Sequence, residues 1–150
     1  MRDEVLSISA AIYSTAAVKG FRTATTLSAL MLLGRQYYIV PAGDSRIYSI
    51  GVEGLMPLTI DNVSESGKLT SCIGLKSHPE LYYSEGVAKS DVYLLCSDGL
   101  YKRVDDHLLL RNVSTQNRKS LRKSLKTLSG FAIERGERDN ISIAIIKIAE

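Results

Sequence analysis

Three aspartates in this sequence stand where an apolar, strand-like run meets turn residues. Asp98 follows the run 92–96 in LLCSDGLY, Asp139 precedes the isoleucine-rich run of RDNISIAIIKI, and Asp44 occupies the turn of PAGDSRIY. If the strands next to Asp98 and Asp139 are antiparallel neighbours, the end of one lies beside the start of the other. The sequence therefore predicts that these carboxylates reach one edge of a sheet.

Carboxylates that converge in this way need a positive partner. Like charges repel, so one carboxylate would otherwise have to take up a proton. A divalent cation removes the repulsion, and oxygen ligands without a nearby His or Cys favour Mg²⁺ or Mn²⁺ over zinc. The alternative is that each aspartate is only a turn or cap residue, because Asp-Gly and Gly-Asp-Ser are common in turns. Spacing by itself favours this alternative.

The composition indicates a single globular domain over residues 1–150. Of the 150 residues, 45% are hydrophobic and 23% are charged, which is enough apolar material for a core. Cys72 and Cys96 are too few and too far apart in the sequence for a disulfide framework or a metal-binding cysteine pair. Both are predicted to be small core residues.

Charge and hydropathy argue against nucleic-acid and membrane partners. The net charge of +3 is small, and the cations of residues 118–126 alternate with leucines as on the solvent face of an amphipathic helix. The apolar segment ATTLSALMLLG is too short to span a bilayer. We therefore expect a cytoplasmic protein that binds neither nucleic acid nor membrane.

The periodicity of apolar residues predicts an α+β protein with helices early and late. Residues 3–18 have helical spacing and end before Gly20, and residues 114–135 form a long amphipathic helix capped by Ser114 or Thr115. Gly51, Gly54 and Pro57 are expected to break the chain. Strands are expected at 25–33 and 36–40 (joined by the hairpin turn at 34–35), 46–50, from 81 towards 87, 92–96 and 140–148. Hairpin-linked strands favour antiparallel sheets covered by helices.

Six motifs occur in an order that resembles one known family. They are TATTLSALML, YYIVPAGDSRIYSI, LTIDN, LTSCIG, DVYLLCSDGLY and RDNISIAIIKI. Their order and spacing, over about residues 10–148, resemble the type 2C metal-dependent serine/threonine protein phosphatases. The resemblance implies an antiparallel β-sandwich flanked by helices. It also implies dephosphorylation of phosphoserine and phosphothreonine proteins by a metal-activated water, with two Mn²⁺ or Mg²⁺ ions in the complete site.

Site residues follow from the resemblance position by position. Asp98 and Asp139 match metal-ligand aspartates, and Asp44 matches the acid associated with a further, weaker metal. Asn140 and Gly99 match neighbours that support the site. The role of Arg46 stays open between orienting Asp44 and binding an anion.

The sequence also departs from the family pattern. Family members carry a D-G-x-G-G motif near the N-terminus, whose aspartate bridges both metals, and no such motif occurs among these 150 residues. We therefore expect an N-terminally incomplete domain, corresponding to about the C-terminal two-thirds of the family domain. The catalytic residue is then unknown, a single or weakly bound metal is expected, and a homodimer would cover exposed sheet edges. The alternative function is an inactive phosphatase-like binding or regulatory module.

Three other polar residues are not expected to carry chemistry. His78 and His107 lack a Cys or acid at ligand spacing, so they are predicted to be surface or cap residues. Ser97 precedes Asp98 in an S-D-G sequence that is unlike a nucleophile elbow. A serine hydrolase is therefore not indicated.

Overall fold

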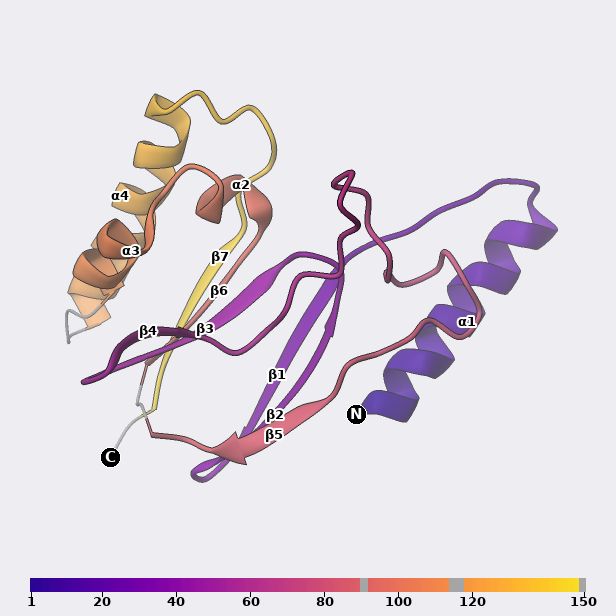
Figure 1. The fold of residues 1–150 in the computed structure, drawn as a ribbon, viewed down its shortest axis with the longest axis horizontal. Coiled ribbons are helices and arrows are strands. Elements are labelled where there is room, and N and C mark those ends of the chain that lie inside the picture. The colour runs from indigo at the N-terminus through magenta and orange to yellow at the C-terminus, as the bar shows by residue number, and fades with distance from the viewer. Residues whose placement is uncertain (90–91, 114–117, 149–150) are drawn as a thin grey trace. The chain divides into compact units, whose positions relative to one another are not determined.

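The structure is a computed structural model that describes residues 1–89, 92–113 and 118–148. The chain divides into two compact units, and each contains one antiparallel sheet (Figure 1). Unit 1 comprises Met1–Ser45 and Ile60–Val87, and unit 2 comprises Arg46–Thr59 and Ala88–Glu150. The expected α+β class, with antiparallel sheets and helices early and late, is confirmed. The single-domain organisation stays a prediction.

Unit 1 consists of a helix and a three-stranded sheet. Its elements are α1 (Arg2–Val18), β1 (Leu27–Leu33), β2 (Gln36–Ala42) and β5 (Ser84–Val87), and the strand order is β1-β2-β5. The predicted hairpin is confirmed, because Leu33 pairs with Gln36 across a two-residue turn. Gly34 in that turn has a φ of 59°, which a glycine adopts without steric cost.

A serine on α1 binds the loop that contains the LTSCIG motif. The hydroxyl of Ser9, which is fully buried, donates to the Lys76 carbonyl at 2.9 Å and accepts from the Gly74 amide at 3.0 Å. A Cβ on Gly74 would lie 2.6 Å from Cγ2 of Ile12 on the same helix. Glycine is therefore needed at this position because α1 passes so close to the loop.

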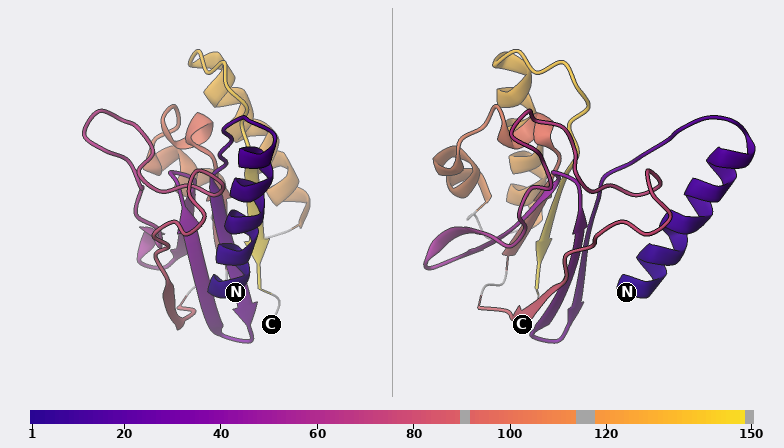
Figure 2. Two further views of the ribbon diagram at one scale, coloured as in Figure 1. Left: turned by 90° about the vertical axis from the view of Figure 1, so that its right-hand side faces the viewer. Right: turned by 45° about the vertical axis from the view of Figure 1, so that its right-hand side comes forward.

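Unit 2 consists of a four-stranded sheet and three helices. The strands are β3 (Arg46–Gly51), β4 (Gly54–Pro57), β6 (Val92–Cys96) and β7 (Ile143–Lys147), in the antiparallel order β4-β3-β6-β7. The helices are α2 (Asp98–Tyr101), α3 (Asp106–Val113) and α4 (Arg118–Glu134). Buried sheet residues pack against buried helix residues in one cluster, and the helices lie along the sheet in both views of Figure 2. That cluster contains Tyr48, Ile50, Leu94, Cys96, Leu100, Val104, Leu109, Val113, Leu128 and Ala132.

Several expected element boundaries were wrong. Gly51 and Gly54 do not break the chain, because they pair with each other at the closed end of the β3–β4 hairpin. The strand expected from residue 81 begins at Ser84, and the last strand is shorter than expected at both ends. Short α2 and α3 were not predicted. The cap expected at residues 114–115 lies outside the described residues.

The helix α3 begins at a capping aspartate that the sequence analysis overlooked. Oδ1 of Asp105 accepts the backbone N–H of Leu108 at 3.0 Å. This hydrogen bond lowers the pKa of Asp105, because it stabilises the ionised carboxylate. The capped start explains why a segment of only eight residues is helical.

Both cysteines lie in the interior, as expected, and neither forms a disulfide within the described residues. Cys72 and Cys96 are 3% and 4% exposed, and Cys96 shares its cluster with Leu94. Burial raises the pKa of the Cys72 thiol. Within residues 1–89, 92–113 and 118–148, no helix has both the length and the apolar character needed to cross a membrane.

Leu128 provides a test of the packing of α4 on the sheet of unit 2. It is fully buried, whereas Ile133 on the same helix is 62% exposed. Leu128→Ala should lower the free energy of unfolding by about 2–5 kcal/mol, because it removes apolar contacts and leaves a cavity. Ile133→Ala should change it by less than about 0.5 kcal/mol. Denaturant unfolding measures both, and equal losses in the two variants would show that α4 packs differently.

Candidate metal centre

The strands that carry Asp98 and Asp139 are neighbours in the sheet of unit 2. β6 and β7 pair in antiparallel fashion, and the ladder ends at the pair Cys96 and Ile143. Asp98 comes two residues after the end of β6, and Asp139 comes four residues before the start of β7. The predicted antiparallel pairing is confirmed. Both aspartates therefore belong to the loops at one end of this pair of strands.

Ser97 joins these two loops beyond the end of the ladder. Its amide donates to the Ser142 carbonyl at 3.0 Å, and its hydroxyl accepts from the Ser142 amide at 3.0 Å. The same hydroxyl lies 3.4 Å from the Asn140 carbonyl, to which it donates. Ser97 therefore extends the pairing of the strands towards the two aspartates, a role that the sequence analysis did not anticipate.

Gly99 allows the loop before β7 to approach α2 closely. A Cβ at this position would lie 2.9 Å from the backbone oxygen of Asn140 and 3.4 Å from Cγ1 of Ile141. A side chain would push the two segments apart, because the nearest atom belongs to the backbone and cannot move aside cheaply. Gly99 is thus required by the close contact between the SDG and RDN motifs.

Asp98 is the first residue of α2 and carries a counter-ion. Its side chain is 32% exposed, and its Oδ2 atom accepts from Nζ of Lys102 at 2.7 Å. Lys102 is itself 56% exposed, so the pair contributes at most about 1 kcal/mol. A divalent cation could displace this ammonium at small cost.

Asp139 is held by its neighbours in the loop. Its Oδ1 atom accepts the backbone N–H of Asn140 at 2.7 Å, and its own N–H donates to Oε1 of Glu137 at 2.9 Å. The backbone N–H of Asp139, the Arg103 side chain and the Arg138 N–H lower the pKa of Glu137 to about 2. The contacts of Glu137 could not be predicted from the sequence, because a glutamate in a polar turn gives no distinctive pattern.

Asp44 belongs to unit 1, in a turn that two other motifs hold. Gly43 has a φ of 108°, and a Cβ there would lie 2.5 Å from Cγ2 of Thr26. The Gly43 amide donates to Oδ1 of Asn62 at 3.2 Å, and the Asn62 amide donates to the Gly43 carbonyl at 2.8 Å. Thr26 of the TATTLSALML motif and Asn62 of the LTIDN motif therefore meet at the turn of PAGDSRIY. A role for Asp44 at a metal stays a prediction.

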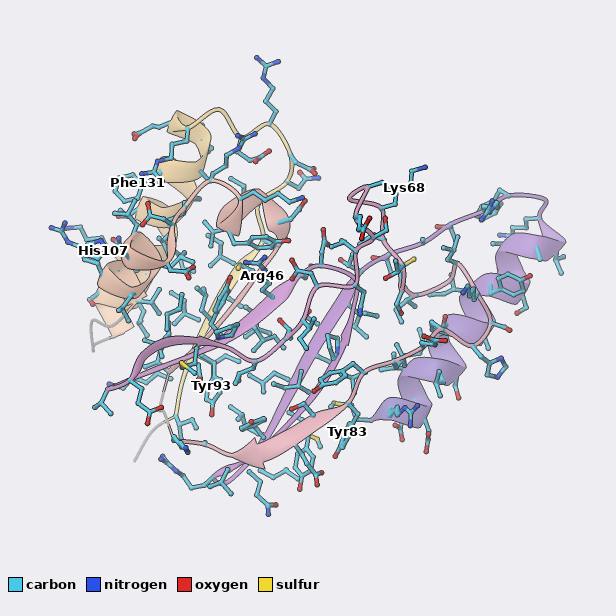
Figure 3. The ribbon with its side chains drawn as sticks, viewed as in Figure 1. Arg46, Lys68, Tyr83, Tyr93, His107 and Phe131 are labelled. Carbon is cyan, nitrogen blue, oxygen red and sulfur yellow. The ribbon has the colours of Figure 1, made fainter. Side chains whose placement is uncertain are left out.

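Arg46 makes two contacts with tyrosines of unit 2. Its Nη1 atom donates to the Tyr48 hydroxyl at 3.1 Å, and its guanidinium carbon lies 3.6 Å from the centre of the Tyr101 ring. Figure 3 labels Arg46, the first residue of β3. The second contact is a cation–π interaction that connects β3 to α2. Burial raises the pKa of Tyr48. Neither predicted role of Arg46 is tested by these contacts.

The two loops of unit 2 offer donors of the kind that a hard divalent cation binds. Asp98 and Asp139 have carboxylate oxygens, the donors that Mg²⁺ and Mn²⁺ prefer, and water can fill remaining positions around such an ion. In the part of the chain that the structure describes, no three His, Cys, Asp or Glu side chains form a metal-binding group. The metal site therefore stays a prediction that rests on two carboxylates.

Comparison with known proteins gives relatives of one kind. A Mycoplasma genitalium protein phosphatase homologue is 28% identical over 149 residues, and the serine/threonine protein phosphatase PstP of Mycobacterium tuberculosis is 27% identical over 146 residues. These matches cover 85% and 84% of this chain. They cover only 56% and 28% of the relatives, so this chain spans about half the length of the first and less of the second. No family model matches the sequence.

Solved structures show the same fold. The serine/threonine phosphatase Stp1 of Staphylococcus aureus superposes with a TM-score of 0.87 at 19% identity, covering 99% of this chain and 66% of that one. A bacterial serine phosphatase also gives a TM-score of 0.87, at 18% identity, covering 98% of this chain and 68% of that one. The expected phosphatase-like fold is therefore confirmed.

Substitution of two helical glycines tests the close contact at Gly99. Alanine normally stabilises a helix relative to glycine by about 0.5–1 kcal/mol. Gly130→Ala on α4 should show this gain, because a Cβ there meets nothing within 4 Å. Gly99→Ala should instead lower the denaturation midpoint, because its Cβ would meet the Asn140 backbone. A gain in stability from both substitutions would contradict the contact.

Proposed function

We propose that this chain is part of a metal-dependent phosphatase that dephosphorylates phosphoserine and phosphothreonine in proteins. The observation that carries the proposal is the pairing of β6 with β7, which brings Asp98 and Asp139 to the same end of two strands. A fold similar to those of bacterial serine/threonine phosphatases supports it, as do the sequence relatives. The substrate partner would be a phosphoprotein.

The proposed cofactor is Mn²⁺ or Mg²⁺, held by Asp98 and Asp139, and the resemblance associates Asp44 with a further, weaker metal. Bound there, the cation supplies a Lewis acid that activates water and neutralises charge on the phosphoryl group. Asn140 and Gly99 support the site through the close contact of their loops. Lys102 pairs with Asp98, and a bound cation would take its place. Arg46 would orient Asp44 or bind an anion.

Other parts of the proposal concern the organisation of the protein. They follow from the resemblance to type 2C phosphatases: the chain is a single domain of the antiparallel β-sandwich class, and it corresponds to about the C-terminal two-thirds of the family domain. A homodimer that covers free sheet edges and a cytoplasmic location complete this proposal.

Metal titration tests the two central ligands. Calorimetry should detect Mn²⁺ binding to the wild type, and Asp98→Asn and Asp139→Asn should each weaken it by at least about tenfold. A matched control is Glu134→Gln, which removes an exposed carboxylate from the end of α4 and should leave the affinity unchanged. The same affinity in the wild type and in both aspartate variants would refute the site.

A second experiment tests turnover. We expect this 150-residue chain to hydrolyse a phosphopeptide with Mn²⁺ slowly, because no residue in it matches the metal-bridging aspartate of the D-G-x-G-G motif. Joining an N-terminal segment that carries this motif should raise the rate roughly a hundredfold or more, since each 1.4 kcal/mol of transition-state stabilisation gives about a factor of ten.

Asp139→Asn in the joined protein is the control for that experiment, and it should remove the gain. Rapid Mn²⁺-dependent turnover by the 150-residue chain alone would contradict the need for a bridging aspartate. A joined protein that binds Mn²⁺ but never turns over would favour the alternative, a phosphatase-like module that binds a partner without catalysis.

A further inference from the structure

Glu137 accepts three hydrogen bonds in the loop of the candidate metal centre, although no motif includes it. Its Oε1 atom accepts the backbone N–H groups of Arg138 at 2.8 Å and Asp139 at 2.9 Å. Its Oε2 atom accepts from Nε of Arg103 at 2.9 Å. The Glu137 side chain is 11% exposed and that of Arg103 is 44% exposed, so the carboxylate is the more enclosed partner of this ion pair.

Arg103 belongs to the segment that carries the other metal-ligand candidate. Its amide donates to the Leu100 carbonyl at 3.0 Å, so it continues directly from α2, the helix that Asp98 begins. Its own carbonyl accepts from Nη1 of Arg135 at 2.6 Å. Arg103 therefore donates one hydrogen bond to Glu137 and accepts one from Arg135, which joins it to residues 135–137.

Two sets of hydrogen bonds join the loops of Asp98 and Asp139, one on each side of the aspartates in the sequence. Ser97, just before Asp98, bonds to Ser142 and to the Asn140 carbonyl, just after Asp139. Arg103, after Asp98, bonds to Glu137, just before Asp139. Each loop is thus fixed on both sides of its aspartate. Holding the loops in place lowers the free-energy cost of bringing two like-charged carboxylates to one cation.

We propose that Glu137 is a positioning residue of the metal centre, which fixes the Asp139 backbone directly and sets its spacing from Asp98 through Arg103. This inference rests on the proposed metal site and assigns Glu137 no contact with the metal. A residue that only stabilised the surface loop would affect unfolding and leave the affinity of the folded protein for metal unchanged. The two roles therefore differ in a measurable way.

The test measures Mn²⁺ affinity by calorimetry on variants of the 150-residue chain at a temperature where circular dichroism shows each to be folded. Glu137→Ala should weaken binding by about tenfold, as expected when a residue that orients a metal ligand is lost. Glu137→Gln should recover part of the loss, because its amide oxygen still accepts the N–H groups of Arg138 and Asp139. Glu134→Ala is the matched control and should bind as the wild type does.

Arg103→Met provides an independent variant, since it keeps the aliphatic part of the side chain and removes the bond to Glu137. It should also weaken Mn²⁺ binding, and it carries the test if Glu137→Ala does not fold. Wild-type affinity in folded Glu137 and Arg103 variants, together with weakened binding in Asp139→Asn, would overturn this inference alone. Wild-type affinity in Asp98→Asn and Asp139→Asn would overturn the metal site itself.

Discussion

The antiparallel pairing of β6 with β7 is the constraint on which the candidate site depends. Because the strands run in opposite directions, the residues after Cys96 and those before Ile143 must emerge at the same end of the ladder. Leu94 and Cys96 of β6 are buried in one cluster with residues of the unit 2 helices, so a one-residue slip in register would turn them away from those helices. Hydrophobic packing of the sheet therefore fixes where two charged loops begin.

Polar contacts then hold the two loops that extend beyond the β6–β7 ladder. Ser97 continues the pairing by one step, Gly99 permits the backbone of Asn140 to approach, and Glu137 binds the amides next to Asp139. These contacts hold the two loops on either side of Asp98 and Asp139, which would lower the cost of ordering them around a cation at the proposed site.

The sequence predicted the parts of the structure that local patterns specify. Strand 92–96, the turn at Gly34 and the long helix α4 have clear periodicity or turn chemistry, and the antiparallel pairing expected of the strands beside Asp98 and Asp139 is observed. β4 was missed because Gly54 and Pro57 look like breakers, and only its partner β3 makes it a strand. Glu137 was missed because its charged partner, Arg103, is 34 residues away in the sequence.

Nuclear magnetic resonance can locate Mn²⁺ in solution relative to Asp98 and Asp139, because paramagnetic broadening falls steeply with distance from the ion. If these two aspartates hold the ion, the amide signals of residues 97–99 and 139–142 should disappear first as Mn²⁺ is added. Signals of Val92 and Lys147, which pair at the opposite end of the β6–β7 ladder, should keep more of their intensity. Equal broadening at both ends of the ladder, or none at Asp98 and Asp139, would contradict the proposed metal site.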